Sequence, residues 1–477
     1  MTTEELFTNP VLVGSGTYGN VYRVEDGDGN RLAVKENLLE GETDFNGAIK
    51  EADLLVRLKG HPHIVELKGI RKGCPFHNPT KIKDKKDSLY FVLEYIPYDL
   101  HSMISRLPSA NLGKYMAQIL LGLEYMHGQG LAHRDIKPCN ILWDKKNGSM
   151  KLCDFGLSRP LDRQGDTTPR VITCWYRAPE VVDCRPYDTK ADMWSVGLVF
   201  AEMIKGEALF KGATDDSRSL SRMIQRYQNL TIDKLLTILD LPSDHPFYLW
   251  DFHYRKRFLE MLVGLLQVDP DNRWTATRCL DSAFFISHAS LIDRTREEHP
   301  IPRLEYRRRI CPTQAREDGL NVACTLFNQR RETDWYRHRI VFTSIDLYDR
   351  YLCYLHDKGM VTCDKMVAEI RYLVCLYVAI KYHLSLYTPP SIVSLLLENK
   401  SRQILSLPQE LGECHRPTLH ATLAAIEEEL LFKVLKFRVY QPTPFCLSRR
   451  LDDGQVKKLL ETMRSLNGDY DVRELTQ

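Results

Sequence analysis

The sequence lacks most of the features that would tie it to an oxidising compartment, a membrane or a nucleic acid. Its 13 cysteines include no Cys-x-x-Cys pair and are odd in number, which argues against a disulfide framework or a zinc site. The 65 Lys and Arg residues nearly balance the 63 Asp and Glu residues, so no excess charge favours nucleic acid. The longest apolar run, residues 372–380, is far too short to span a bilayer, and residues 1–5 are too acidic and polar for a signal peptide. We expect an intracellular protein, cytoplasmic or nuclear and not secreted, that uses neither nucleic acid nor membrane as a partner.

The length and the apolar pattern predict several domains. A chain of 477 residues is too long for one typical core. Apolar residues alternate as in strands up to about residue 100, follow mostly helical spacing from residue 112, and lose their periodicity after Phe285. A charged, proline-broken stretch then separates this part from a second, almost wholly helical one. The expected parts are a first domain of residues 7–287, a linker of residues 288–319, a helical domain of residues 320–445 and a tail of residues 446–477.

A glycine-rich turn between two expected strands indicates a phosphate site. It reads Gly14-Ser15-Gly16-Thr17-Tyr18-Gly19-Asn20-Val21, and glycines let the backbone approach phosphates closely. Alone this motif is weak. Leu32-Ala33-Val34-Lys35 follows, with Lys35 placed to hold the α- and β-phosphates of a nucleotide and Glu51 as its candidate helix partner. An isolated pair of this kind is more often two solvent-exposed charges, so the rest of the series decides.

The run His133-Arg134-Asp135-Ile136-Lys137-Pro138-Cys139-Asn140 carries the chemistry of phosphoryl transfer. Asp135 is the expected catalytic base, and Lys137 would neutralise charge on the transferred phosphoryl group. Asn140 and Asp154, the latter in Asp154-Phe155-Gly156, would hold Mg²⁺ against the phosphates of ATP. A single Asp or Asn is more often a cap or turn residue. The whole ordered series, which ends with Ala178-Pro179-Glu180, predicts an active enzyme.

These motifs resemble those of eukaryotic protein kinases over residues 7–287, and several resemble the cyclin-dependent kinases. Trp175-Tyr176-Arg177-Ala178-Pro179-Glu180 is similar to the end of that family's activation segment, where the arginine favours Ser/Thr-Pro substrates. Phe45-Asn46-Gly47-Ala48-Ile49-Lys50-Glu51 lies where the family carries its cyclin-binding PSTAIRE helix. The resemblance implies an α+β bilobal kinase fold that binds ATP and Mg²⁺. It also implies a nucleotide pocket that contains Val21, Ala33, the gatekeeper Leu93, the backbone of Glu94 and Ile96, and Asp99 at the ribose.

The resemblance implies control by phosphorylation as well. Thr168 occupies the family's activating position, and Arg134 and Arg159 stand where two phosphate-binding arginines are expected. Lys50 replaces the third arginine. Because lysine lacks the bidentate fork of arginine, we expect a weaker grip on the phosphate.

The second helical stretch resembles a single cyclin box, an all-α domain. Asp346-Leu347-Tyr348-Asp349-Arg350-Tyr351-Leu352, Ala379-Ile380-Lys381-Tyr382 and Glu427-Glu428-Glu429-Leu430 are similar to its motifs, in order. By this resemblance Lys381 and Glu428 would grip the PSTAIRE-like helix, Ile49 would enter an apolar pocket of the box, and Asp349 would hold the box together. Leu320 stands where cyclins usually carry an arginine, which puts that internal polar bridge in doubt.

Together the two resemblances imply a proline-directed Ser/Thr kinase fused to its own cyclin-like activator. Its partners would be protein substrates with Ser/Thr-Pro sites and its own cyclin-like domain, engaged in cis or by domain exchange. Two alternatives stay open. One is a constitutive kinase with an unrelated helical scaffold or targeting tail, and the other is a non-catalytic interaction protein that recruits another kinase.

Overall fold

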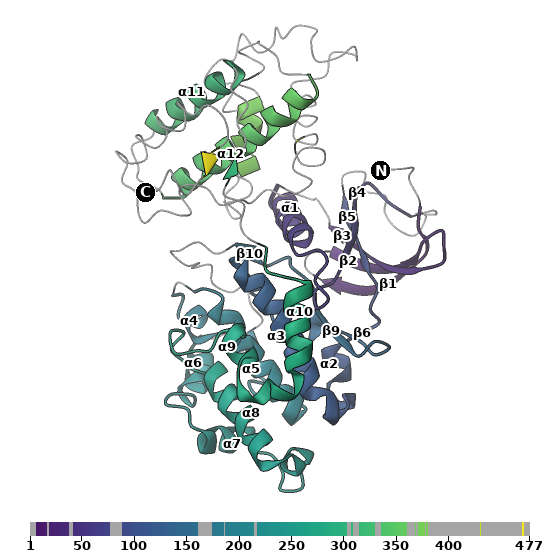
Figure 1. The fold of residues 1–477 in the computed structure, drawn as a ribbon, viewed down its shortest axis with the longest axis vertical. Helices are drawn as coiled ribbons and strands as arrows, with labels where there is room; N and C mark the ends of the chain where they lie inside the picture. The colour runs from purple at the N-terminus through teal and green to yellow at the C-terminus, as the bar shows by residue number, and fades with distance from the viewer. Residues whose placement is uncertain are drawn as a thin grey trace. The chain divides into compact units, whose positions relative to one another are not determined.

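A computed structural model divides the chain into two compact units. The first unit contains Met1–Leu39 and Arg57–Arg303, and the second contains Glu40–Val56 and Leu304–Gln477 (Figure 1). No helix in the described part of the chain is long and apolar enough to cross a membrane. The structure describes residues 6–16, 19–37, 42–76, 88–160, 174–185, 187–213, 217–302, 307–308, 314–329, 335–359, 368, 371–376, 378–379, 430 and 470–471.

The first unit begins with an antiparallel sheet in the order β1-β2-β3-β5-β4. Its strands are β1 (Thr8–Gly16), β2 (Gly19–Glu25), β3 (Arg31–Asn37), β4 (Leu67–Lys72) and β5 (Leu89–Glu94). Because successive side chains of a strand point to opposite faces, the register assigns each residue to one face of the sheet.

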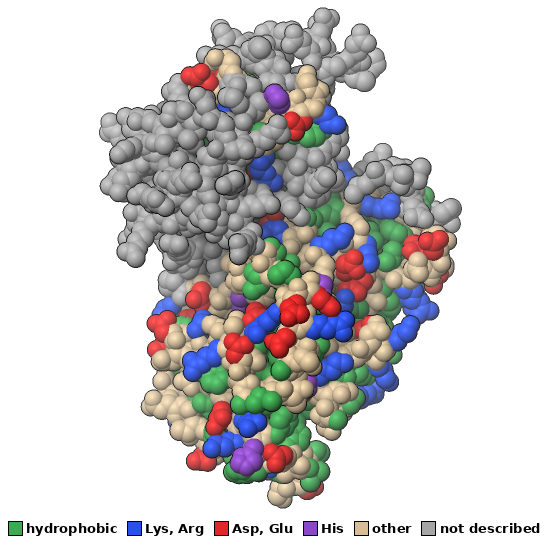
Figure 2. Space-filling model, in the orientation of Figure 1, with side chains coloured by type: hydrophobic (Ala, Val, Ile, Leu, Met, Phe, Trp, Pro, Cys, Tyr) green, Lys and Arg blue, Asp and Glu red, His purple; other side chains and the backbone are tan. Residues whose placement is uncertain are grey.

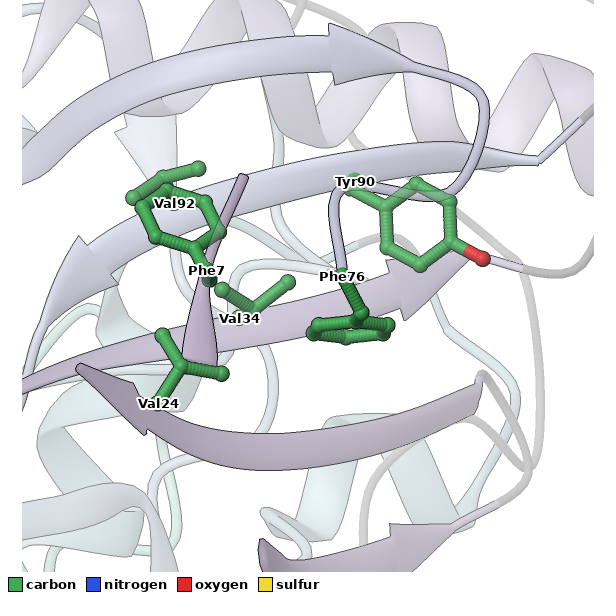
Figure 3. Close-up of a cluster of buried hydrophobic side chains, with 6 residues drawn as sticks. All are labelled: Phe7, Val24, Val34, Phe76, Tyr90 and Val92. Carbon is green, nitrogen blue, oxygen red and sulfur yellow. The ribbon is translucent and has the colours of Figure 1, made fainter. Parts of the chain in front are cut away.

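One face of this sheet carries a hydrophobic core (Figure 3). Val24, Val34, Tyr90 and Val92 come from three neighbouring strands, and two aromatic side chains from outside the sheet cover them, Phe7 and Phe76. The backbone of Phe7 joins that of Pro75 by a 2.8 Å hydrogen bond, which holds the two covering segments together.

The rest of the first unit is mostly helical, as the sequence predicts. α3 (Leu112–Gly128) and α5 (Lys190–Lys205) are buried along nearly their whole length. Basic and acidic side chains are interspersed over its surface on the face drawn in Figure 2, in keeping with a net charge of +2. The other helices and strands of this unit are β6 (Tyr98–Asp99), α2 (Leu100–Met103), β7 (Leu131–Ala132), β8 (Ile141–Asp144), β9 (Ser149–Leu152), β10 (Arg159–Pro160), α4 (Pro179–Val182), α6 (Ser217–Gln225), α7 (Ile232–Leu239), α8 (Phe252–Leu265), α9 (Ala276–Leu280) and α10 (Ala289–Glu298).

Helix α10 occupies ten residues of the stretch expected to be a linker. Arg296 fixes it, because this guanidinium pairs with Glu124 of α3 at 2.7 Å and with Asp281 at 3.0 Å. The sequence pattern missed the helix since its buried residues are few, Ile292 and Thr295. The first unit therefore continues to Arg303.

The second unit contains α11 (Gln314–Gln329), α12 (Trp335–Asp357) and all of α1 (Glu42–Arg57) except its last residue. α11 and α12 meet closely at Gly319, where a Cβ atom would collide with the ring of Tyr348. The Tyr348 hydroxyl donates to the carbonyl oxygens of Ala315 and Ala368 at 2.8 and 3.1 Å. The edge of the Tyr372 ring packs against Tyr348 with centroids 5.4 Å apart.

The second unit also contains two short strands outside residues 320–445, the range expected to form the helical domain. A short antiparallel pair joins β11 (Arg307–Arg308) to β12 (Tyr470–Asp471), with Arg307 opposite Asp471. Residues assigned to the linker and to the tail therefore pair with each other within this unit.

Candidate active site

The glycine-rich turn lies at the end of the β1–β2 hairpin. Register places Gly14 opposite Val21, Val21 opposite Lys35, and Ala33 opposite Leu93, so Val21, Ala33, Lys35 and Leu93 share one face of the sheet. This face is the one opposite the core of Figure 3. The predicted nucleotide-binding side chains of three strands thus come together.

Gly19 closes this turn in a conformation reserved for glycine. Its φ is +135°, and a Cβ atom there would collide with the carbonyl oxygen of Glu36. Ser15 and Gly16 end β1 on the other side of the turn. Thr17 and Tyr18 lie outside the described residues.

Lys35 and Asp154 form an ion pair beneath the sheet. Lys35 Nζ lies 3.0 Å from Asp154 Oδ1, and Lys35 is 8% exposed. Burial alone would raise the pKa of Asp154, but the charge and hydrogen bond of Lys35 outweigh it and lower that pKa. Asp154 has a φ of 61°, an uncommon backbone conformation that fixes the direction of its carboxylate.

The expected catalytic base is held by its neighbours in the loop before β8. Asp135 Oδ2 accepts hydrogen bonds from Lys137 Nζ at 2.7 Å and from Asn140 Nδ2 at 2.9 Å. Asn140 Nδ2 also donates to the carbonyl oxygen of Asp135 at 2.8 Å. The three residues that the spacing predicts for catalysis are therefore in mutual contact.

Asn140 and Asp154 offer oxygen atoms suited to a hard cation. The side-chain nitrogen of Asn140 donates to Asp135, so the Oδ1 atom of Asn140 remains as an acceptor. Lys35 engages Asp154 Oδ1, and within the described residues Asp154 Oδ2 has no hydrogen-bond donor. Mg²⁺ prefers such oxygen ligands, so the donor set fits the metal that the sequence implies. When bound with ATP, such a metal would supply positive charge that offsets the charge of the phosphates.

Asp192 anchors the catalytic loop from α5. Its carboxylate accepts the backbone N–H groups of His133 and Arg134, both at 2.8 Å, and the Nε2 of His127 lies 2.9 Å away. Burial would raise the pKa of Asp192, but its hydrogen bond to His127 and nearby positive charge lower it. Arg134 adopts a φ of 71°, which the two bonds to Asp192 hold in place.

The end of β5 and the segment after it contain the residues predicted to form the hinge. The Glu94 amide donates to the carbonyl oxygen of Glu66 at 3.0 Å, and its carboxylate lies 2.6 Å from Lys151 Nζ. Within the described residues, neither backbone group of Ile96 is paired with another backbone group. Asp99 caps α2 by accepting from the Ser102 amide at 2.7 Å.

Comparison with known proteins agrees with this geometry. The protein kinase domain family matches residues 7–285. The chain belongs to the protein kinase family. Cyclin-dependent kinase B2-2 of Arabidopsis thaliana is 31% identical over 307 residues, which cover 59% of this chain and 93% of that protein. Cyclin-dependent kinase B2-1 of Oryza sativa subsp. japonica is 31% identical over 313 residues, covering 59% and 90%. This kinase is thus of the cyclin-dependent type.

The end of the activation segment in this kinase is tied to the helical core. Arg273, whose side chain is fully buried, makes two bonds to Glu180, of 2.7 and 2.9 Å. The hydroxyl of Ser195 donates to the carbonyl oxygen of Tyr176 at 2.7 Å. Arg177, the predicted proline-selecting residue, follows directly and is 6% exposed.

The predicted regulatory residues of the kinase are spread over both units. Thr168, Lys381 and Glu428 lie outside the described residues. Arg159 has a described backbone, which pairs with Ala132 across β10 and β7. Ile49, Lys50 and Glu51 are buried residues of α1 in the second unit. The pairing of Glu51 with Lys35 and the binding of a phosphate by Lys50, Arg134 and Arg159 stay predictions.

The structure identifies an internal bridge that the sequence analysis missed. Arg316 of α11 pairs with Asp349 of α12, with Nε–Oδ1 and Nη2–Oδ2 distances of 2.6 and 3.2 Å, and both side chains are buried. The resemblance to a cyclin box placed the expected arginine at position 320, which Leu320 occupies. That position lies one helical turn later, on the same face of α11. The arginine was therefore expected on the correct face of α11 but one helical turn too late in the sequence.

Proposed function

We propose that this kinase transfers the γ-phosphoryl group of ATP to Ser or Thr hydroxyls of proteins. The observation that carries the proposal is the contact of Asp135 with Lys137 and Asn140 beside the Lys35–Asp154 pair. The substrate oxygen would attack the γ-phosphorus while the bond to the β,γ-bridging oxygen breaks and ADP leaves. Asp135 would take the hydroxyl proton, and Lys137 would offset charge on the transferred group.

Arg177 supports a preference for proline after the acceptor residue, by the family resemblance given above. The decisive measurement is phosphotransfer to a Ser-Pro peptide and to its Ser-Ala counterpart. We expect wild type to favour the first and Asp135→Asn to lose activity on both by at least about 100-fold, the scale of general-base catalysis. Activity retained by Asp135→Asn, with folding unchanged, would contradict the assignment of the base.

We further propose that the second unit activates the kinase in cis as a cyclin. Two observations support this. The PSTAIRE-like segment within Glu40–Val56 belongs to the same compact unit as Leu304–Gln477. The Arg316–Asp349 bridge supplies the internal polar link that the leucine at position 320 had put in doubt. Thr168 would be the activating phosphorylation site.

The test of cis activation uses the full chain. Lys381→Ala combined with Glu428→Ala should lower phosphotransfer sharply. Lys358→Ala, at an exposed lysine just after α12, is the matched control and should leave activity unchanged. Full activity of the double variant would favour a constitutive kinase with a scaffold tail.

A further inference from the structure

Four polar side chains form a row across the sheet, one from each of four neighbouring strands. Register pairs Ser15 of β1 with Asn20 of β2, and Glu36 of β3 with Tyr90 of β5. Val21 lies opposite Lys35, so Asn20 and Glu36 are the next positions along the same two strands. We call Ser15, Asn20, Glu36 and Tyr90 the polar ladder.

Hydrogen bonds connect each member of the polar ladder to the next. Ser15 Oγ donates to Asn20 Oδ1 at 3.0 Å, and Asn20 Nδ2 donates to Glu36 Oε2 at 3.3 Å. Tyr90 Oη donates to Glu36 Oε1 at 3.1 Å. Glu36 is therefore the central member, with one carboxylate oxygen toward the glycine-rich turn and the other toward the core.

Glu36 and Tyr90 are buried, whereas Ser15 is exposed and Asn20 is half-buried. Glu36 is 3% exposed and Tyr90 is fully buried within the core of Figure 3. A carboxylate at this depth loses much of its hydration, so its bonds to Asn20 and Tyr90 offset a cost of desolvation. Because the partners of Glu36 are fixed by packing, the geometry at Asn20 is fixed too.

The ladder lies on the face of the sheet opposite Lys35. Glu36 follows Lys35 in β3, so the two side chains point to opposite faces of the sheet. The backbone carbonyl of Glu36 also lies directly against Gly19, at the end of the glycine-rich turn. Glu36 thus contacts the turn twice, through its backbone at Gly19 and through its side chain at Asn20.

We propose that Glu36 is a positioning residue that fixes the glycine-rich turn above the nucleotide phosphates by anchoring Asn20 to the buried Tyr90. This proposal rests on the proposed use of ATP. It assigns to Glu36 an effect on ATP affinity rather than on the chemical step, because the turn contacts the nucleotide before and during transfer alike.

The experiment compares Glu36→Met with Glu36→Gln in the full chain. Methionine removes both acceptor oxygens, so we expect about 2- to 12-fold weaker ATP binding by calorimetry, the range of one lost hydrogen bond. The kcat at saturating ATP should be unchanged. Glutamine can accept from Asn20 and donate to the Tyr90 oxygen, so it should restore most of the affinity.

Two further variants keep the test decisive if Glu36→Met folds poorly. Asn20→Ala removes the ladder's bond to Glu36 at a half-buried position, so it should give the same loss of ATP affinity. In the double variant with Glu36→Met, it should lower the ATP affinity little further. Asn37→Ala is the matched control, because Asn37 is also buried in β3 but donates to the Leu89 carbonyl at 3.4 Å and not toward the turn.

ATP affinity that is unchanged in Asn20→Ala, or lowered equally by Asn37→Ala, would overturn the proposal. So would a wild type that binds no ATP. Calorimetry reads nucleotide binding without phosphotransfer, so a protein that binds ATP but phosphorylates no peptide would refute the proposed kinase activity while leaving the role of Glu36 testable.

Discussion

His61 and His63 show how strongly burial can set the protonation state of a side chain in this protein. The His61 ring stacks on Tyr125 with centroids 4.6 Å apart and meets the edges of His63 and His299, each at 5.7 Å. Burial lowers the pKa of His61 to about 2 and that of His63 to about 4. Both rings are therefore neutral in the folded protein at neutral pH.

These histidines should make the first unit sensitive to mild acid. Unfolding restores a pKa near 6.5, so the unfolded chain binds more protons as pH falls from about 6.5 toward 4. Each histidine then lowers the free energy of unfolding by up to about 1.4 kcal/mol per pH unit. His61→Phe, which keeps the stacking on Tyr125, should flatten this slope in urea titrations across that pH range. His253→Asn, at an exposed histidine, should not, and equal slopes for both variants would contradict the assignment.

At the scale of secondary-structure elements, a buried ion pair joins α11 to α12. The side chains of Arg316 and Asp349 are 4% and 2% exposed. Such a pair contributes little net stability compared with apolar residues of the same size, but removal of one partner is costly because the other charge stays buried.

Asp349→Ala should therefore destabilise the second unit by about 3–5 kcal/mol. The double variant Arg316→Met with Asp349→Leu should recover most of that loss. Urea unfolding followed by far-ultraviolet circular dichroism measures both. A cost for Asp349→Ala of only about 0–1 kcal/mol, as for a surface pair, would show that the bridge does not hold these helices.

The elements that sequence predicts best are those whose residue types and spacing are set by chemistry. Asp135, Lys137 and Asn140 lie within one short loop, so their spacing reports their contacts. The polar ladder was not foreseen, because the bond from Asn20 to Glu36 depends on strand register, which no local pattern in β2 or β3 reveals.

Arg316 was missed because the start of α11 was placed at residue 320, whereas the helix begins at Gln314. Helix α10 was missed because an ion pair with Glu124, and not a broad apolar stripe, holds it to α3.

At the scale of the whole molecule, a covalent link between activator and kinase would mean that the concentration of a separate partner no longer controls the activity. A flexible connection keeps a second domain at roughly millimolar effective concentration, so a micromolar docking affinity would suffice to keep nearly all molecules engaged.

Specific activity should then be independent of protein concentration over roughly a thousandfold dilution, because an intramolecular equilibrium does not change on dilution. The measurement is the initial rate per molecule on a Ser-Pro peptide. Specific activity that rises with concentration, together with a dimer in analytical ultracentrifugation, would instead indicate exchange of the second unit between two copies.

The discontinuous second unit also orders events during synthesis. The segment Glu40–Val56 is made about 250 residues before Leu304, a delay of roughly 12–50 s at about 5–20 residues per second. Throughout that interval α1 has emerged from the ribosome while its companions in the second unit do not yet exist, and β12 completes the unit only at Tyr470–Asp471. Under the proposed activation, each chain would therefore stay inactive during synthesis until the ribosome has made the residues of its own activator.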